Sequence, residues 1–408
     1  MADVAPPPAR DWATEFDHTK EDYAAAAPEI WDELRQRCPV AHSDAHGGVW
    51  LPTRHEDVSA VARDTDHFSS ESVVVSKFKP HGLAPMGFAP PITSDPPFHA
   101  EARRLLLPAF APREIERWEP ATRDTCNELI DELLADGSDV VDAAAGYAQH
   151  IPVRVIAEML GLPREDGDRF RLFIHRILEK PGESVDLPYE ETLVYYLSQV
   201  IRRRRQEPHR DDLIGFLLNA EMDGEPLTDE HIFGSIALLL IAGIDTTWSA
   251  IGSSLWHLAQ HPEDRHRLRD DPDVVPFAME ELLRFYAPVT MARITATDTE
   301  IGGCPVPARD WVLLPFPAAN RDPEAFERAG EFVIDRQRNR HLAFGLGIHR
   351  CLGSNLARME LRVAVEEWLR RIPEFELADP DPAAVRWSTG QVRGPRQLPL
   401  RLLPTGDA

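Results

Sequence analysis

Cysteine is scarce in this chain of 408 residues, which contains only four of them. They lie far apart, and no two form a Cys-x-x-Cys pair; they are Cys38, Cys126, Cys304 and Cys351. This spacing argues against a disulfide framework, a zinc ribbon or an iron–sulfur cluster. The N-terminus has an aspartate and a proline cluster where a secretory signal needs a basic start and an apolar run. Export is therefore not expected, and a reducing cytoplasm is the predicted compartment.

Positive charge is also in deficit, because 44 lysine and arginine residues face 68 aspartate and glutamate residues, a formal net charge of −24. Such a field disfavours binding to nucleic acid or to an anionic membrane, so neither is predicted as a partner. The one conspicuous basic run, Arg202–Arg205, follows an apolar helical stretch. We interpret this run as the solvated last turn of a helix, where cations are favoured.

A membrane-length apolar run is missing as well. In the longest apolar-rich stretch, 232–258, the uninterrupted apolar part covers only Ile236–Gly243, and Asp245 follows it. A span needs about 20 apolar residues, so the stretch predicts a helix buried in a core. Thr228 is its expected N-cap, and His261 followed by Pro262 is its expected end.

Repeats and low-complexity linkers are absent from the sequence, which predicts one architecture. We expect a flexible proline-rich N-terminus over 1–20 and a single domain over 21–408. Residues 45–62 predict a short strand and then a helix, 98–260 are mostly helical, and 289–316 predict short strands around a turn. Helix returns after Cys351, so the predicted fold is mainly α with small β-sheets.

The most informative segment of the chain is the glycine-containing loop that ends at Cys351. Gly345 and Gly347 permit tight turns whose N–H groups can point at the sulfur. Apolar residues then recur at helical spacing, which places the sulfur at a helix N-terminus, where the thiolate is favoured. The alternative is a buried free cysteine. Together, Phe344, Gly345, Gly347, His349, Cys351 and Gly353 resemble the heme-ligand loop of the cytochrome P450 family.

The resemblance implies the mainly α heme-thiolate fold, with heme b as cofactor and Cys351 as the thiolate ligand of its iron. The implied reaction is monooxygenation, in which one oxygen atom of O2 enters a substrate and the other enters water. The family's loop also implies that Phe344, Gly345, His349 and Gly353 contact the cofactor. The segment Asn320–Phe326 resembles the family's segment leading to that loop and adds no chemistry.

A second segment, Ala242–Thr246, lies midway along the long apolar helix and resembles the family's oxygen-activating segment. The small residues Ala242 and Gly243 let a flat cofactor and dioxygen approach the backbone. Thr246 can donate to the carbonyl four residues earlier, which loosens the helix. Asp245 and Thr246 offer an acid and a hydroxyl that could relay protons. Taken alone, they could be a structural polar pair.

Two further pairs carry charge at helical spacing. Glu281 and Arg284, at i and i+3, would ordinarily form a solvated bridge. They resemble the family's Glu-x-x-Arg pair, which implies a buried structural network completed by Arg336. The other pair, His99 and Arg103, would singly be surface bases. The resemblance implies that four basic residues bind the heme propionates: His99, Arg103, Arg293 and His349.

The electrons for monooxygenation must come from a separate protein, because the chain shows no flavin, nicotinamide or ferredoxin segment. A ferredoxin with its reductase is the expected source. Docking of an acidic ferredoxin on this acidic chain would depend on local arginines near the sulfur. The candidates are Arg104, Arg350, Arg358 and Arg362.

The resemblance also maps a substrate pocket with a mainly apolar lining. This lining predicts a hydrophobic small molecule such as a terpenoid, an aromatic compound or a polyketide-like compound. Lys77 and Lys79 could anchor a carboxylate, but mobile surface lysines are the preferred interpretation. The predicted pocket residues are Phe78, Leu83, Met86, Phe88, Phe173, Ile177, Leu178, Leu239, Ala242, Val289, Thr290, Met291, Thr389, Gly390, Gln391 and Val392.

Three alternatives remain open at this point. A peroxide-driven heme-thiolate peroxygenase would need no reductase and no proton-delivery pair such as Asp245 and Thr246. A non-enzymatic heme sensor or carrier would bind heme without substrate turnover. A helical binding module without cofactor would be colourless when purified.

Overall fold

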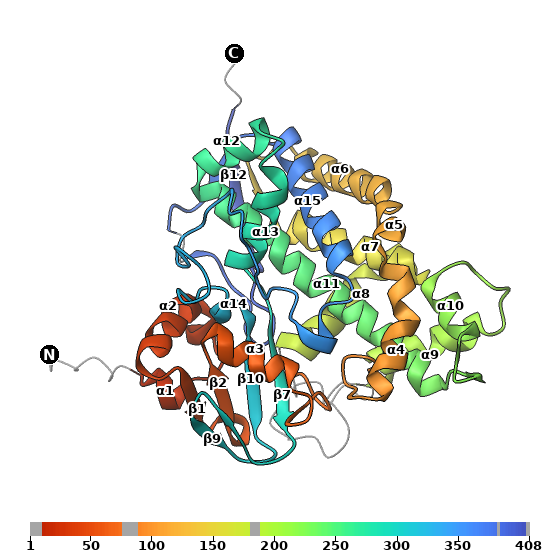
Figure 1. The fold of residues 1–408 in the computed structure, drawn as a ribbon. Helices are drawn as coiled ribbons and strands as arrows, with labels where there is room; N and C mark the ends of the chain where they lie inside the picture. Colours follow the sequence, from red (N-terminus) through yellow and green to blue (C-terminus); the bar gives the residue numbers. More distant parts are fainter. Residues whose placement is uncertain (1–9, 76–88, 180–187, 382–383, 405–408) are drawn as a thin grey trace, which may run out of the picture.

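The computed structural model describes residues 10–75, 89–179, 188–381 and 384–404, and in it most helices pack beside and above one larger sheet (Figure 1). That sheet has the order β1-β2-β10-β7-β3 and holds both antiparallel and parallel pairs. Its strands are β1 (Val40–Ser43), β2 (Val49–Pro52), β10 (Trp311–Pro315), β7 (Thr290–Thr295) and β3 (Phe68–Ser69).

Smaller sheets complete the strand content of the described residues. A three-stranded sheet has the order β11-β12-β4, and two hairpins stand alone. The bounds are β4 (Val140–Asp142), β11 (Phe375–Leu377) and β12 (Pro399–Leu402), with hairpins β5 (Glu221–Met222) and β6 (Glu225–Pro226), and β8 (Thr299–Ile301) and β9 (Cys304–Val306). Little of the chain is strand, which agrees with the predicted fold class.

Helices supply the rest of the architecture. Four accompany the larger sheet: α1 (Trp12–Glu15), α2 (Glu21–Arg37), α3 (His55–Arg63) and α14 (Phe316–Ala319). The others are α4 (Phe98–Leu106), α5 (Pro112–Glu116), α6 (Glu119–Leu134), α7 (His150–Leu160), α8 (Gly167–Ile174), α9 (Leu193–Arg204), α10 (Leu213–Asn219), α11 (Asp229–Gln260), α12 (Pro262–Asp270), α13 (Val275–Phe285) and α15 (Ser354–Arg371).

Helix α11 runs through the middle of the helical part, beside α7 and α15 (Figure 1). The Thr228 side chain accepts a hydrogen bond from the backbone N–H of His231, and α11 ends just before His261, as the sequence predicts. Within the described residues α11 alone has the length and apolar composition of a membrane span. However, 78% of its most apolar window is buried inside the protein, as expected for a core helix.

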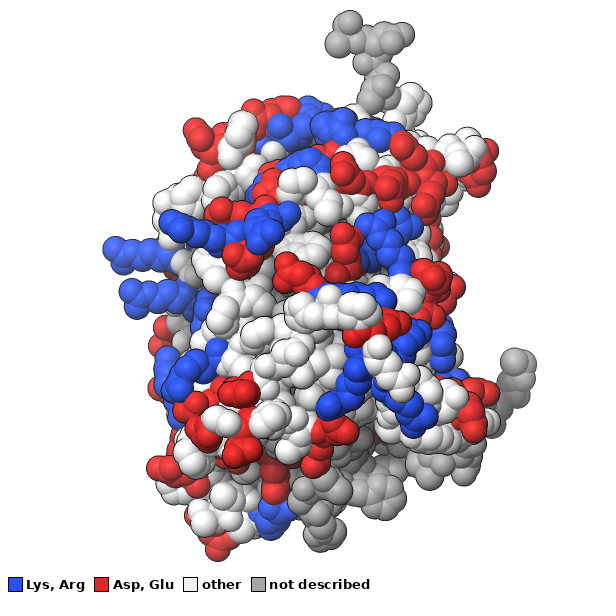
Figure 2. All heavy atoms as spheres, turned by 90° about the vertical axis from the view of Figure 1, so that its right-hand side faces the viewer, with Lys and Arg blue, Asp and Glu red and all other residues white. Residues whose placement is uncertain are grey.

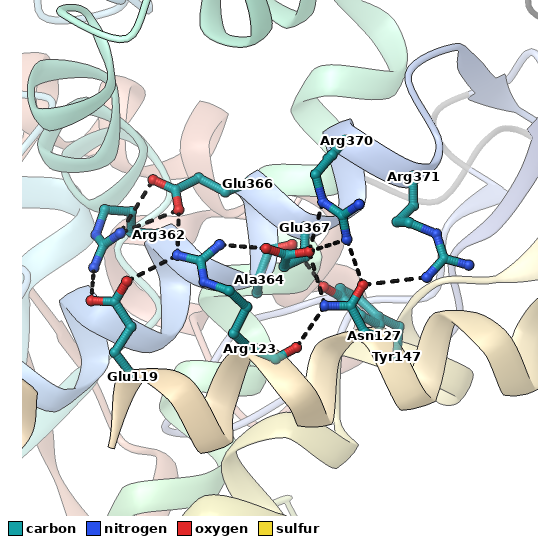
Figure 3. Close-up of polar contacts among 10 residues, drawn as sticks. All are labelled: Glu119, Arg123, Asn127, Tyr147, Arg362, Ala364, Glu366, Glu367, Arg370 and Arg371. Carbon is teal, nitrogen blue, oxygen red and sulfur yellow. Dashed lines mark hydrogen bonds and ion pairs between the residues drawn. The ribbon is translucent and has the colours of Figure 1, made fainter. Parts of the chain in front are cut away.

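Helix α15, which begins just after Cys351, is joined to α6 by a network of ion pairs (Figure 3). Arg123 binds three carboxylates, those of Glu119, Glu366 and Glu367. Arg362 of α15 pairs with Glu119 of α6, and its Nη2 lies 2.6 Å from Glu119 Oε2. Arg362 also pairs with Glu366 of its own helix. Partly buried networks of this kind hold more strongly than single surface pairs. The helix behind the cysteine loop is therefore fixed to the core.

Residues at the N-terminal end and in the basic run differ from the expectations of the sequence. Phe16 and His18 precede the expected domain start at residue 21, yet both side chains are buried. Arg204 is not solvated but buried, and its Nη2 lies 2.7 Å from Asp212 Oδ1. The interpretation of Arg202–Arg205 as a wholly solvated turn was wrong, because Arg204 faces the start of α10, where Asp212 caps the helix.

Candidate active site

A cavity of about 230 Å³ lies between α11 and the segment that carries Cys351. Its walls come from parts of the chain that are far apart in sequence. Of the residues singled out in the sequence, those lining it are Arg103, Leu239, Ala242, Gly243, Thr246, Val289, Met291, Arg293, Phe344, Gly345, His349, Cys351 and Gly353. The structure thus gathers most of the predicted cofactor site around one space.

The cysteine loop adopts its shape through two glycines in the left-handed region, Gly345 at φ +62° and Gly347 at φ +68°. A Cβ on Gly347 would lie 2.8 Å from the carbonyl oxygen of Ala62, so a larger residue would be excluded there. The backbone N–H of Cys351 donates to the carbonyl of Phe344 at 2.8 Å, which closes the loop. These contacts hold the sulfur at the wall of the cavity.

The surroundings of Cys351 have opposing effects on the pKa of its thiol. Burial raises its pKa, while the backbone N–H of Gly353 and the guanidinium groups of Arg103 and Arg350 act in the opposite direction. A bound metal ion deprotonates such a thiol outright. The surroundings therefore suit a thiolate that is formed by coordination to iron.

Three basic side chains line the cavity, Arg103, Arg293 and His349, and His99, which does not line it, packs against His349. The rings of His99 and His349 lie 4.3 Å apart, and His99 Nε2 is buried without a hydrogen-bond partner. Within the described residues, no carboxylate lies within ion-pair distance of Arg103 or Arg293. Burial lowers the pKa of Arg293 to about 10. Buried cations need anions, so this cluster fits the two propionates of a heme.

The middle of α11 separates the two residues of the Asp-Thr pair. Thr246 lines the cavity, and its hydroxyl donates to the carbonyl of Ala242 at 2.9 Å. The helix is nevertheless continuous from Asp229 to Gln260, so the loosening that we predicted does not interrupt it. Asp245 does not line the cavity. It is fully buried on another side of the helix, with Oδ1 2.7 Å from Nη2 of Arg396.

Arg396 connects Asp245 to the surface of the protein. Its Nε donates to Glu179 at 2.6 Å, and Glu179 in turn lies 3.1 Å from Nδ1 of His175, a half-exposed side chain. Burial raises the pKa of Asp245 to about 6, although the guanidinium of Arg396 acts in the opposite direction. Asp245 can therefore change its protonation state near neutral pH, and it lies at the inner end of a chain of ionisable groups.

Glu281, Arg284 and Arg336 lie together in the core, as the resemblance implied. Arg284 donates to both oxygens of Glu281 at 2.8 Å, and Arg336 Nε donates to the same carboxylate at 3.0 Å. Arg284 also donates to the carbonyl of Asn320, whose side chain accepts from the N–H of Leu342, two residues before the cysteine loop. The network thus fixes the start of that loop.

Glu360 is a candidate functional residue that was not predicted from the sequence. This carboxyl group of α15 is buried at the cavity wall, where burial raises its pKa to about 8 although a hydrogen bond from Thr247 opposes the shift. A signal was available, because Glu360 interrupts the apolar face that Leu356 and Val363 define on this helix. No comparable sequence signal marks Arg396, Glu179 or Ser70. The Ser70 hydroxyl forms a hydrogen bond of 2.9 Å with Nε2 of His349.

Several residues predicted for the substrate pocket do not reach the cavity wall. Phe173 is buried against Tyr196, and Leu178 is buried in the same core. Gln391 turns to His18 instead. In the described structure the cavity is not lined by Phe173, Ile177, Leu178, Thr290, Thr389, Gly390, Gln391 or Val392. The remaining four, Phe78, Leu83, Met86 and Phe88, and also Lys77 and Lys79, lie outside the described residues.

Comparison with known proteins identifies the family. The family model of cytochrome P450 matches residues 189–382. The mycinamicin IV hydroxylase/epoxidase of Micromonospora griseorubida is 35% identical over 91% of this chain and 94% of its own length. The nocardicin C N-oxygenase of Nocardia uniformis subsp. tsuyamanensis is 38% identical over 90% of this chain and 92% of its own.

Solved structures agree. The bacillaene polyketide synthase cytochrome P450 PksS of Bacillus subtilis 168 aligns with a TM-score of 0.85 at 29% identity, covering 95% of this chain and 100% of its own. CYP109E1 from Bacillus megaterium, solved in complex with testosterone, gives 0.84 at 31% identity, covering 94% of this chain and 100% of its own. The chain therefore belongs to the cytochrome P450 family. It is a heme-thiolate monooxygenase that uses heme b, a small-molecule substrate, O2 and a redox partner.

Proposed function

We propose that this monooxygenase oxidises a hydrophobic small molecule in the cytoplasm with electrons from a ferredoxin. The observation that carries the proposal is a cavity lined by the apolar side chains of Leu239, Val289 and Met291. Thr246 and Cys351 line the same cavity. Relatives of this chain are named for reactions on mycinamicin IV and nocardicin C, which supports a natural product of comparable type. Residues 21–408 would act as one catalytic domain.

A spectral screen tests the substrate class. Ligands that displace iron-bound water shift the heme absorption, so apolar polyketides, terpenoids and aromatic compounds are expected to give shifts, while small charged metabolites give none. Hits are then incubated with NADH, ferredoxin and reductase, or with hydrogen peroxide alone. Oxidation only with the reductase system supports the proposal, whereas oxidation driven equally well by peroxide would favour a peroxygenase.

Heme supplies the activation of dioxygen, and the protein's residues hold it and deliver protons. Cys351 would supply the thiolate that binds the iron, and Arg103, Arg293 and His349, with His99 packed against His349, would neutralise the propionates. Thr246 would orient a proton-bearing group within the cavity. Asp245 would hold a proton and pass it toward Thr246, while the guanidinium of Arg396, which keeps its own protons, positions the carboxyl group beside Glu179. Proton supply by a positioned acid accelerates such reactions.

Replacing Asp245 with asparagine is expected to slow substrate oxidation by about 10²-fold, the lower end of what a positioned acid contributes. Burial holds the pKa of Asp245 at about 6, so the wild-type rate should change as the pH passes through about 6. Below that value the carboxyl carries a proton to deliver, and above it the carboxylate must be recharged from solvent. The pH profile of turnover measures both effects.

The matched control for Asp245→Asn is Asp131→Asn, which changes an exposed aspartate paired with Arg371. It should leave the rate and its pH profile unchanged. Arg396→Gln should alter the pH profile as well, because it removes the cation that faces Asp245. A profile in Asp245→Asn identical to that of the wild type would show that the proton takes another route, with Glu360 as the nearest buried acid at the cavity wall.

Of the four arginines proposed to dock a ferredoxin, three already pair with carboxylates of this chain. Arg104 binds Glu101, Arg358 binds Glu280, and Arg362 binds Glu119 and Glu366. Figure 2 shows the face at the right of Figure 1, where acidic and basic side chains are interspersed. Arg350 is exposed and has no carboxylate within ion-pair distance among the described residues. It is the candidate with a free charge to offer.

We expect Arg350→Glu to slow reduction by a ferredoxin about tenfold at low salt, because a charge reversal changes electrostatic steering. Stopped-flow reduction at increasing ionic strength measures this, and the two proteins should converge at high salt as screening removes the difference. The control is Arg202→Glu, the same charge reversal at an exposed residue of α9. Equal rates for wild type and Arg350→Glu at low salt would refute docking through Arg350.

A further inference from the structure

A second cavity, of about 280 Å³, lies apart from the first. The second cavity lies among α2, the C-terminal end of α13, α14 and the C-terminal part of α11. The two cavities share no lining residue, since the walls of the second are Pro28, Glu29, Trp31, Ser253, Trp256, His261, Phe285, Tyr286, Ala287, Pro317, Arg321, Trp387 and Arg393. Nothing in the monooxygenase reaction requires this space.

Two guanidinium groups face the second cavity, and each lies on an aromatic ring. Arg393 is 3.9 Å from the centre of the Trp387 ring, and Arg321 is 4.4 Å from that of Phe285. Stacking fixes the planes of these groups and leaves their edges free for hydrogen bonds. Arg393 uses only its Nε, which donates to the carbonyl of Ala24 at 2.8 Å. Its terminal nitrogens are therefore available to a ligand.

The carboxylate of Glu29, which also lines the cavity, offsets the charges of these two arginines only in part and forms no ion pair with either. Within the described residues, no carboxylate lies within ion-pair distance of Arg321 or Arg393. Arg321 Nε is buried without a hydrogen-bond partner. Burial lowers the pKa of both groups, and for Arg393 to about 10. A cluster of this kind costs free energy unless an anion occupies it, and arginine pairs favour planar, bidentate carboxylates.

The remaining walls select for a flat ligand. Trp256 makes edge contacts with Trp387 at 5.3 Å and with Tyr286 at 5.8 Å between ring centres, so the cavity has a rigid aromatic wall. The indole Nε1 of Trp256 is buried and has no hydrogen-bond partner. Aromatic surfaces beside paired guanidiniums match the two ends of an aromatic carboxylate.

We propose that this cavity is a binding site for an aromatic carboxylate, distinct from the site that holds heme and substrate. The carboxylate would bind Arg321 and Arg393, and the ring would pack against Trp256 and Trp387. Its position also links it to the active site. The backbone N–H of Arg393 donates to the carbonyl of Pro288 at 2.8 Å, and Pro288 and its neighbour Val289 line the first cavity.

The test uses heme-loaded enzyme whose iron is already coordinated by 4-phenylimidazole, so that the first cavity is closed. Isothermal titration calorimetry with 2-naphthoate should then show one binding site. Arg393→Gln and Arg321→Gln should each weaken binding at least about tenfold, because each removes a charged hydrogen-bond partner. Arg386→Gln, an exposed arginine that does not line the cavity, should bind as the wild type does.

Two comparisons make the result decisive. The neutral analogue 2-naphthalenemethanol should bind at least about tenfold more weakly than 2-naphthoate, because it lacks the charge. Arg393→Lys keeps the cation and should retain part of the affinity, and unchanged heme absorption in every variant shows that the fold persists. Absence of 2-naphthoate binding, equal binding by Arg393→Gln, or equal binding of the alcohol would each overturn the proposal.

Discussion

Replacing Cys351 with alanine is expected to abolish substrate oxidation and the thiolate-type absorption of the reduced, carbon monoxide-bound protein. The sulfur is the one thiol at the wall of the first cavity within the described residues, and the other sulfur at that wall, the thioether of Met291, carries no negative charge. The Cys351 thiolate would supply the electron density that favours O–O cleavage by a bound heme, so the alanine variant should lack oxygen activation. Turnover should fall to the background of free heme.

The control is Cys304→Ala, which removes a half-buried thiol of β9 that does not line the cavity. It should keep full heme content, the thiolate-type spectrum and turnover. The heme content of Cys351→Ala should fall less than its activity does, because the four basic side chains still bind the propionates. A normal thiolate-type spectrum in Cys351→Ala would refute the assignment.

Replacing Glu281 with glutamine is expected to cost about 3–5 kcal/mol of unfolding free energy. Glu281 is fully buried and is the carboxylate partner of both Arg284 and Arg336, so its removal leaves two buried cations without an anion. Domains are stable by only about 5–15 kcal/mol, so the variant should unfold at much lower urea concentration or fail to retain heme. Urea unfolding followed by circular dichroism measures the loss.

Glu331→Gln is the matched control, because Glu331 also binds an arginine, Arg328, but both side chains are exposed. No measurable change in the unfolding midpoint is expected for it, since exposed pairs contribute little. If Glu281→Gln and Glu331→Gln unfolded at the same urea concentration, the Glu281 network would not be the support of the cysteine loop that the geometry indicates.

Local signals in the sequence predicted local features well. The Thr228 cap, the end of α11 at His261 and the tight turns at Gly345 and Gly347 all depend on backbone chemistry within a few residues. The predicted fold class is confirmed by the mainly helical structure with small sheets and by its similarity to solved cytochrome P450 structures. The expected roles of Asp245 and Thr246 remain predictions.

Contacts between distant segments could not be predicted in the same way. Arg396 reaches Asp245 only because the C-terminal segment packs over α11. The residues next to either one in the sequence do not predict this ion pair. Arg204 was misjudged for a different reason, because its partner Asp212 is nearby in the chain but belongs to the start of the next helix, which it caps. The wall of the substrate cavity depends on side-chain packing, so Phe173 and Gln391 were assigned to it without reaching it.

The two sides of the active site are built from different kinds of contact. The cysteine loop rests on buried charge networks around Glu281, whereas the opposite wall consists of single apolar side chains such as Leu239, Val289 and Met291. Volume-conserving exchanges among apolar residues cost less than about 1.5 kcal/mol, while breaking a buried ion pair costs more. Evolution or directed mutagenesis can therefore redesign what this enzyme oxidises, one side chain at a time, without disturbing how it holds iron.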